Sequence, residues 1–314
     1  MAKQKGQQRA LVSKLSFRAS MKKYWILYLM LLPGLLYFLI FKYGSMFGLV
    51  TAFMDYRLTK GIFGSQWVGF THFTKFFNSR QFGTLFINTF RLAICNIIFF
   101  FPLPILVALL INEIQNKPFK STVQGLIYIP HFVSWVVVAS IVVELLNSQD
   151  GVITQMINQA FGTKINVLSN KNTFVGLITG EQMWKEFGWG TIIFLSALSG
   201  VDIQLYEAAK MDGANRFQRV LYVTLPAMKS IIIIQLILRM GNFLNTGFEQ
   251  ILLALNSSNR SVAEVFDTYV YETALQNGRI SYGTAIGMFK SVVSLVLVVT
   301  VNAIAKKAGE EGVY

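Results

Sequence analysis

The stretch Leu92–Asn112, LAICNIIFFFPLPILVALLIN, contains no charged side chain, and Ser121–Val143 contains no lysine, arginine, aspartate or glutamate. Each is as long as the roughly 20 residues that one helical crossing of a bilayer needs. Backbone N–H and C=O groups in hydrocarbon must be paired within the segment, which favours helices. These two stretches therefore predict an all-α integral membrane protein.

The composition supports the same class. Of the 314 residues, 54% are hydrophobic and 14% are charged, whereas soluble domains carry about 25% charged residues. We expect six spans at about Tyr24–Met46, Gly83–Asn112, Ser121–Leu146, Thr173–Gly200, Lys229–Leu253 and Ser281–Ala305. Because Glu181, Lys185 and Glu186 crowd the first half of the fourth span, its membrane part is expected to begin near Phe187.

Lysine and arginine near the span ends predict the orientation. The N-terminus, residues 113–120, residues 201–229 and the C-terminus together hold 15 such residues, against nine in the opposite set. By the positive-inside rule, both termini are cytoplasmic. The expected parts are a cytoplasmic basic segment at 1–23, a six-span transmembrane domain at 24–305 and a cytoplasmic tail at 306–314.

The net charge of +13 is explained by this asymmetry. Anionic lipid headgroups are sufficient partners for it, so the bilayer is expected as a partner and nucleic acid is not. Residues Gln7–Lys23 mix apolar and basic side chains. An amphipathic interfacial helix and a basic tail that only orients the protein both stay open. A cleaved signal peptide is not expected.

Several chemical motifs are absent from the sequence. It contains no G-x-x-x-x-G-K-[ST] phosphate loop, and His72 and His131 lie far apart without metal-ligand spacing. We therefore expect no catalytic residue, metal site or cofactor in this chain. His131, after Pro130, is expected to be an interfacial hydrogen-bonding residue, and the single cysteine, Cys95, a small packing residue.

The loop at 201–229 has the sequence of two short helices separated by Gly213. Residues Glu207–Met211 favour a helix, and Gly213 provides a turn conformation that other residues adopt poorly. Asn215 is suited to cap the next helix, and Pro226 fits the first turn of the following span. A docking surface for another protein and a loop packed on its own spans both remain open on this evidence.

Glu207-Ala208-Ala209, followed by Gly213 and then by Val223-x-Leu225-Pro226, resembles the EAA signature of permeases in binding-protein-dependent ABC importers. This resemblance implies the type I importer permease fold, with the loop seated in a cleft of an ATPase subunit. The implied coupling residues are Tyr206, Glu207, Ala208, Ala209, Asp212, Gly213, Ala214, Leu225 and Pro226. Glu207 would pair with a basic group there.

Further segments resemble the subfamily that imports oligosaccharides and polysaccharide fragments. They are Leu31–Phe38, Ala52–Tyr56, Trp184–Thr191, Gly247–Ile251, Asp267–Tyr271 and Ser281–Ala285. The chain departs from it at Gly44-Ser45, where relatives often have proline. The resemblance implies the first permease of a heterodimeric pair in a bacterial cytoplasmic membrane. Its partners would be a second permease, a solute-binding protein, an oligosaccharide, and an ATPase dimer carrying ATP and Mg²⁺.

Ionisable residues within spans are costly and are treated as candidates for function. Arg91, Arg239 and Lys290 lie in predicted spans, with Glu186 and Glu249 as expected partners. They line a substrate path or form ion pairs between spans, and three cations that face a cavity would favour an acidic sugar. Trp184 and Trp189 stack on sugar rings or occupy the membrane interface.

A secondary transporter or channel shares the apolar composition but does not need the EAA loop. A membrane scaffold that couples energy without handling substrate is a second alternative. A neighbouring gene for a second permease would exclude the first alternative, a secondary transporter or channel.

Overall fold

The computed structural model describes residues 21–147, 150–162, 167–168, 170–310 and 312–313. Most of the predicted segment Gln7–Lys23 lies outside these residues. The chain forms two compact units, residues 1–51 and 52–314, and each is described by itself.

The first unit contains one apolar helical segment. Helix α3 (Trp25–Tyr37) continues as a π-helical stretch, Phe38–Gly44, and a 3-10 stretch, Phe47–Phe53, follows. None of the side chains in the most apolar window of Trp25–Phe53 is buried within the chain. A helix that is apolar on all sides suits lipid or another membrane subunit as its surroundings.

The second unit contains a short hairpin and helices. Strands β1 and β2 pair antiparallel, with Met54 opposite Trp67. The elements are β1 (Met54–Asp55), α4 (Gly61–Gly64), β2 (Gln66–Trp67), α5 (Thr71–Phe77), α6 (Arg80–Cys95), α7 (Pro102–Asn112), α8 (Lys117–Phe132), α9 (Trp135–Leu146), α10 (Val152–Phe161), α11 (Lys171–Ser199), α12 (Ile203–Met211), α13 (Arg216–Arg219), α14 (Leu225–Gly241), α15 (Phe248–Ala254), α16 (Arg260–Ala263), α17 (Phe266–Val270) and α18 (Ile280–Lys307).

Within the described residues of the whole chain, four continuous helical segments are long and apolar enough to cross a bilayer, and two bent pairs raise the number to six. The predicted six-span architecture is confirmed. The third span is bent by 89° between α8 and α9, where Val133 is extended and the Ser134 side chain caps α9 by accepting from the Val137 N–H. The fourth helix begins at Lys171, and the Glu181, Lys185 and Glu186 side chains in its first half have partners inside the unit. Where the membrane part of this helix begins stays a prediction.

The fifth span differs from its prediction of Lys229–Leu253. A continuous helical segment runs from Arg216 to Gly241, joined by a π-helical stretch, Val220–Thr224. The second predicted short helix of the 201–229 loop is therefore the start of this span. Residues 242–247 interrupt the helix before α15, and Gly247 adopts a left-handed conformation with φ +92°, which favours glycine.

Helix α11 is central to the packing of this unit. It contacts α7, α8 and α14, and Phe194 and Leu198 on it pack with Met228 of α14 in one buried cluster. At Gly188 it approaches α8 so closely that a Cβ atom would lie 1.9 Å from the Ile127 carbonyl oxygen. Only glycine permits that crossing.

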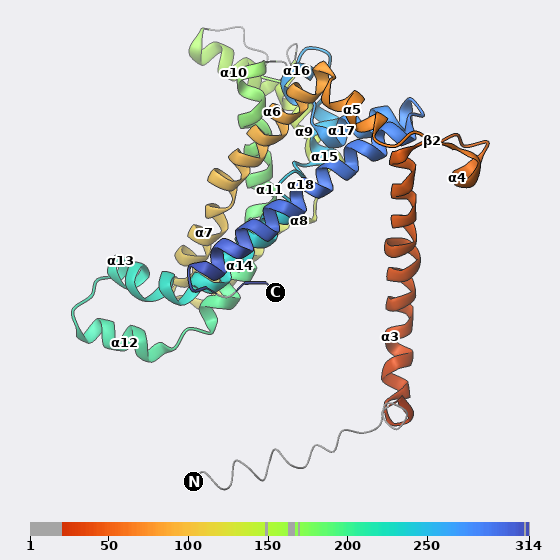
Figure 1. Ribbon diagram of the computed structural model, residues 1–314. Coiled ribbons are helices and arrows are strands. Elements are labelled where there is room, and N and C mark those ends of the chain that lie inside the picture. The colour runs from red at the N-terminus through yellow and green to blue at the C-terminus, as the bar shows by residue number, and fades with distance from the viewer. Residues whose placement is uncertain (1–20, 148–149, 163–166, 169, 311, 314) are drawn as a thin grey trace. The chain divides into compact units, whose positions relative to one another are not determined.

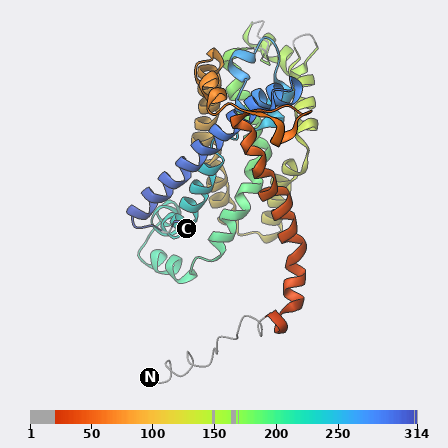
Figure 2. The ribbon, with the colours of Figure 1, turned by 45° about the vertical axis from the view of Figure 1, so that its right-hand side comes forward.

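The two ends of the second unit carry different elements. Helices α12 and α13 lie at one end, and α10 and α16 lie at the other (Figure 1). The turned view preserves this separation (Figure 2). The spans between them position the polar residues described next.

Candidate functional site

The break at residues 242–247 lines two adjoining cavities. Asn242 and Gly247 face the first cavity, Gly241 faces the second, and Asn245 lines both. The Asn245 Nδ2 donates to Asn242 Oδ1 at 2.9 Å. Non-helical backbone at membrane depth is tolerated where it lines a polar cavity or is buried in protein. The interrupted span therefore places irregular backbone against two cavities with polar linings.

The first cavity, called the Arg239 cavity, has a volume of about 460 Å³. Its lining mixes aromatic rings with amides and charges. It comprises Phe100, Phe101, Pro104, Trp135, Gln182, Glu186, Trp189, Gly190, Ile193, Phe194, Gln235, Leu238, Arg239, Asn242, Asn245 and Gly247.

Glu186 is already bound by two groups of this unit. Lys185 Nζ donates to Glu186 Oε1 at 3.2 Å, and His131 Nδ1 lies 2.7 Å from Glu186 Oε2. Lys185 is 4% exposed; it also donates to the His131 carbonyl at 2.6 Å and lies over the Trp135 ring at 5.2 Å. The network connects α8, α9 and α11 at the bend of the third span, and it neutralises Glu186.

Two polar groups of the Arg239 cavity lack a direct ion pair or hydrogen bond among the described residues. The Arg239 guanidinium lies 4.8 Å from the centre of the Phe100 ring, and the described residues place no carboxylate within salt-bridge distance of it. The buried Gln182 Oε1 accepts no hydrogen bond from the described residues. The cavity thus offers one cation that forms no direct ion pair, with Glu186 acting on it only at longer range, and one acceptor without a hydrogen bond.

The second cavity, called the Lys290 cavity, has a volume of about 480 Å³. Lys290 of α18 forms an ion pair with Asp267 of α17. The cavity is lined by Gly241, Asn245, Asp267, Gly287, Lys290, Ser291, Ser294, Leu295 and Val298. Its two charges form a direct ion pair, whereas Arg239 forms none among the described residues.

The structure brings together part of the predicted substrate path. Glu186, Trp189 and Arg239 line one cavity, and Lys290 lines the adjoining one. Arg91 instead lines a separate, largely apolar hollow with Phe86, Ile87, Phe90, Ile94 and Cys95.

The expected partners of these charges differ from the observed ones. Glu249 is exposed on α15 and pairs with none of the three predicted cations among the described residues. The sequence did not indicate that Asp267 is the partner of Lys290. It also did not indicate that Lys185 and His131 are the partners of Glu186. His131 fits its expected hydrogen-bonding character. Trp184 is 52% exposed and lines neither cavity.

The 201–229 segment has the predicted local signals. Gly213 has φ +80°, and Asn215 and Gln218 form a reciprocal capping box at the start of α13. Pro226 lies in the first turn of α14. The Tyr206 hydroxyl lies 3.1 Å from Thr224 Oγ1 and joins the two arms of the segment.

The tip of this segment is exposed and partly apolar. Met211 is 87% exposed and Phe217 is 74% exposed, while Glu207 and Ala208 of α12 are also exposed. Large apolar side chains in such positions are typical of a surface that another protein covers.

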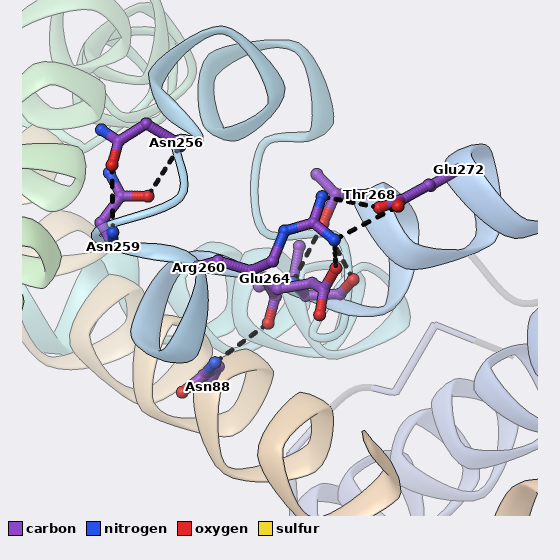
Figure 3. Close-up of polar contacts among 8 residues, drawn as sticks. Asn88, Asn256, Asn259, Arg260, Glu264, Thr268 and Glu272 are labelled. Carbon is purple, nitrogen blue, oxygen red and sulfur yellow. Dashed lines mark hydrogen bonds and ion pairs between the residues drawn. The ribbon is translucent and has the colours of Figure 1, made fainter. Parts of the chain in front are cut away.

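At the opposite end of the unit, a polar cluster holds the α16 loop in place (Figure 3). Asn88 Nδ2 donates to the Ser261 and Glu264 carbonyls at 3.1 and 3.0 Å, and Arg260 forms a bidentate pair with Glu272. Burial raises the pKa of the Glu264 carboxyl, with Arg260 opposing the shift and Glu272 adding to it. Sequence reasoning missed this cluster because its members are distant along the chain.

Residues 100–309 match the family model described as the binding-protein-dependent transport system inner membrane component. The chain belongs to this family. Its members are permease subunits of ABC importers, so the alternatives of a secondary transporter, a channel and a scaffold are set aside.

Similar proteins of this family include two from Bacillus subtilis (strain 168). One is the polygalacturonan/rhamnogalacturonan transport system permease protein YteP, 52% identical over 92% of this chain and 90% of the relative. The other is the protein LplB, 49% identical over 96% of this chain and 94% of the relative.

A solved structure of a bacterial alginate ABC transporter, in complex with a periplasmic protein bound to alginate pentasaccharide, also contains a similar chain. That chain superposes with a TM-score of 0.85 at 37% identity, covering 94% of this chain and 98% of the other. The type I importer permease fold and the multi-pass membrane character of the family are thereby established for this chain.

Proposed function

We propose that this permease imports oligosaccharides that carry carboxylates, and that the Arg239 cavity holds a carboxylated sugar unit. The observation that carries the proposal is the Arg239 guanidinium, which forms no direct ion pair among the described residues and lines one cavity with Trp189 and the unpaired Gln182 acceptor. The relatives named for polygalacturonan and alginate transport support an acidic cargo.

The cavity supplies three kinds of contact to such a sugar. Arg239 donates two parallel hydrogen bonds to the carboxylate, and the indole of Trp189 packs on the apolar face of the sugar ring. Gln182 accepts from a hydroxyl. Since Lys185 and His131 bind both oxygens of Glu186, that carboxylate repels the substrate little.

The transport cycle then depends on the 201–229 segment. In this proposal α12 docks on an ATPase subunit at the cytoplasmic face, with Glu207, Ala208, Ala209 and Gly213 at the contact. Two ATPase subunits form a dimer that closes when it binds ATP and Mg²⁺. A second permease completes the translocation path. A solute-binding protein delivers the sugar at the end that carries α10 and α16.

The test compares three forms of one disaccharide on the importer, purified through a tag on this chain and placed in nanodiscs. Digalacturonate has two carboxylates, its monomethyl ester has one, and its dimethyl ester has none. We expect the two acidic forms to stimulate ATP hydrolysis more than the dimethyl ester, and Arg239→Gln to abolish that difference. Equal stimulation by all three forms in the unmodified importer would refute an acidic cargo.

A further inference from the structure

We infer that the Lys290 cavity is a second saccharide subsite that is electrically neutral, so that only the sugar unit at Arg239 needs a carboxylate. This inference rests on the proposed function and assigns its charge preference to one of two adjoining subsites. The three cations of the sequence then have different roles rather than a shared one.

The first step is that the two cavities are neighbours that share one wall residue. Asn245 lines both, and its hydrogen bond to Asn242 connects the walls. Both volumes, about 460 and 480 Å³, fall within the range of small-molecule sites, roughly 300–1,000 Å³. In this inference a disaccharide bound beside Asn245 places one sugar unit in each cavity.

The second step is the pairing of Lys290. Its ammonium is held by Asp267, and the two side chains are 13% and 25% exposed. A substrate carboxylate that took Lys290 would leave Asp267 partly buried without a counter-ion, which is costly. The intact pair instead offers Asp267 as an acceptor and Lys290 as a donor to sugar hydroxyls.

The third step is the remaining lining. Ser291 and Ser294 of α18 and the Asn245 amide add hydroxyl and amide groups to the Lys290 cavity. Within the described residues, the lining contains no charge besides Lys290 and Asp267. This set of groups suits a neutral ligand that is rich in hydroxyl groups.

The decisive variant is Asp267→Asn, which keeps the side-chain shape and frees Lys290. We measure the affinities of the nanodisc-embedded importer for digalacturonate and its monomethyl ester, and take their ratio. In the unmodified importer the two affinities should be similar, within a factor of about three, because one carboxylate satisfies Arg239. Asp267→Asn should raise the preference for the two-carboxylate form by about tenfold or more, equivalent to about 1.4 kcal/mol.

Two further variants complete the design. Lys290→Met combined with Asp267→Asn should return the ratio to that of the unmodified importer, because neither charge remains. Asp55→Asn is the matched control, since Asp55 forms an exposed ion pair with Arg57 that lies outside both cavities. The thermal unfolding midpoint and the co-purified proteins are recorded for each variant.

The outcomes separate the two proposals. If no form binds better than the dimethyl ester in the unmodified importer, the proposed acidic cargo fails. If the acidic forms bind better but Asp267→Asn leaves the ratio of the two affinities unchanged, only the neutral-subsite inference is overturned. This holds whether or not the partner proteins still co-purify with the variant. A loss of acidic preference in the Lys290/Asp267 double variant, as in Arg239→Gln, also overturns it.

Discussion

The imidazole ring of His131 lies flat against the indole of Trp189, with ring centroids 4.4 Å apart and ring planes inclined by 6°. Since His131 is held by Glu186 at 2.7 Å, the stack fixes the orientation of the indole. One face of Trp189 is covered by this stack, and the residue lines the Arg239 cavity.

Replacing Trp189 should therefore weaken sugar binding. Trp189→Leu is expected to lower the affinity for digalacturonate about tenfold, because a packed aromatic surface contributes about 1 kcal/mol or more beyond area alone. Trp184→Leu is the matched control, since Trp184 lines neither cavity. Equal losses in the two variants, measured by equilibrium binding in nanodiscs, would argue against a stacking role.

Lys185 should be essential for the stability of the bent third span. Lys185→Met removes one of the two partners of the Glu186 carboxylate and the donor to the His131 carbonyl, and breaking a buried ion pair costs about 3–5 kcal/mol. We expect a clear fall in the thermal unfolding midpoint. Lys171→Met, at the exposed start of the same helix, should leave the midpoint nearly unchanged.

In the 201–229 segment, position 213 should tolerate only residues that can adopt the left-handed backbone conformation of Gly213. Nothing lies within 4 Å of a Cβ atom added there, so the strain comes from φ alone. Gly213→Asn should keep ATPase co-purification, because asparagine adopts the left-handed region more readily. Gly213→Val should lose it.

Substitutions on α12 provide an independent test of docking. Glu207→Ala and Ala209→Trp should reach the membrane yet lose transport. Normal sugar uptake by these variants and by Gly213→Val would show that the segment is not the docking surface.

The orientation can be tested by thiol labelling in a Cys95→Ser background. Asn259 is unsuitable because it is fully buried, whereas Ser258 beside it is exposed. An impermeant reagent should modify Ser258→Cys in intact cells but spare Gln204→Cys on α12. The reverse labelling pattern would place the 201–229 segment on the outside of the cell membrane.

Stability should depend on pH through Glu264. Its folded pKa is raised by burial, so the folded state binds a proton more tightly than the unfolded state does. The resulting penalty is present above the folded pKa and disappears as the pH falls through it. The unfolding midpoint of the unmodified protein should therefore rise, relative to Glu264→Gln, as the pH is lowered from about 8 toward about 4.

The exposed Glu249→Gln is the control for this comparison. Because Arg260 keeps its bidentate pair with Glu272 in Glu264→Gln, the loop should stay folded. An identical pH profile for the unmodified protein and Glu264→Gln would contradict the prediction.

The sequence by itself determined the class of the protein, its six spans and the local geometry of residues 201–229. Hydrocarbon requires each spanning segment to pair its own backbone groups, so uninterrupted apolar length is sufficient evidence for a span. The turn at Gly213 and the cap at Asn215 involve residues a few positions apart, and local chemistry decides such features.

Only the tertiary structure decided where the fifth helix breaks and which charges meet. Asp267 and Lys290 are on different helices, as are His131 and Glu186, and helix packing alone brings each pair together. The same packing placed Arg239 in a cavity and Arg91 in a separate apolar hollow, although both are single arginines in predicted spans. A residue's face on its helix depends on its neighbours in space, and hydrophobic length carries no information about them.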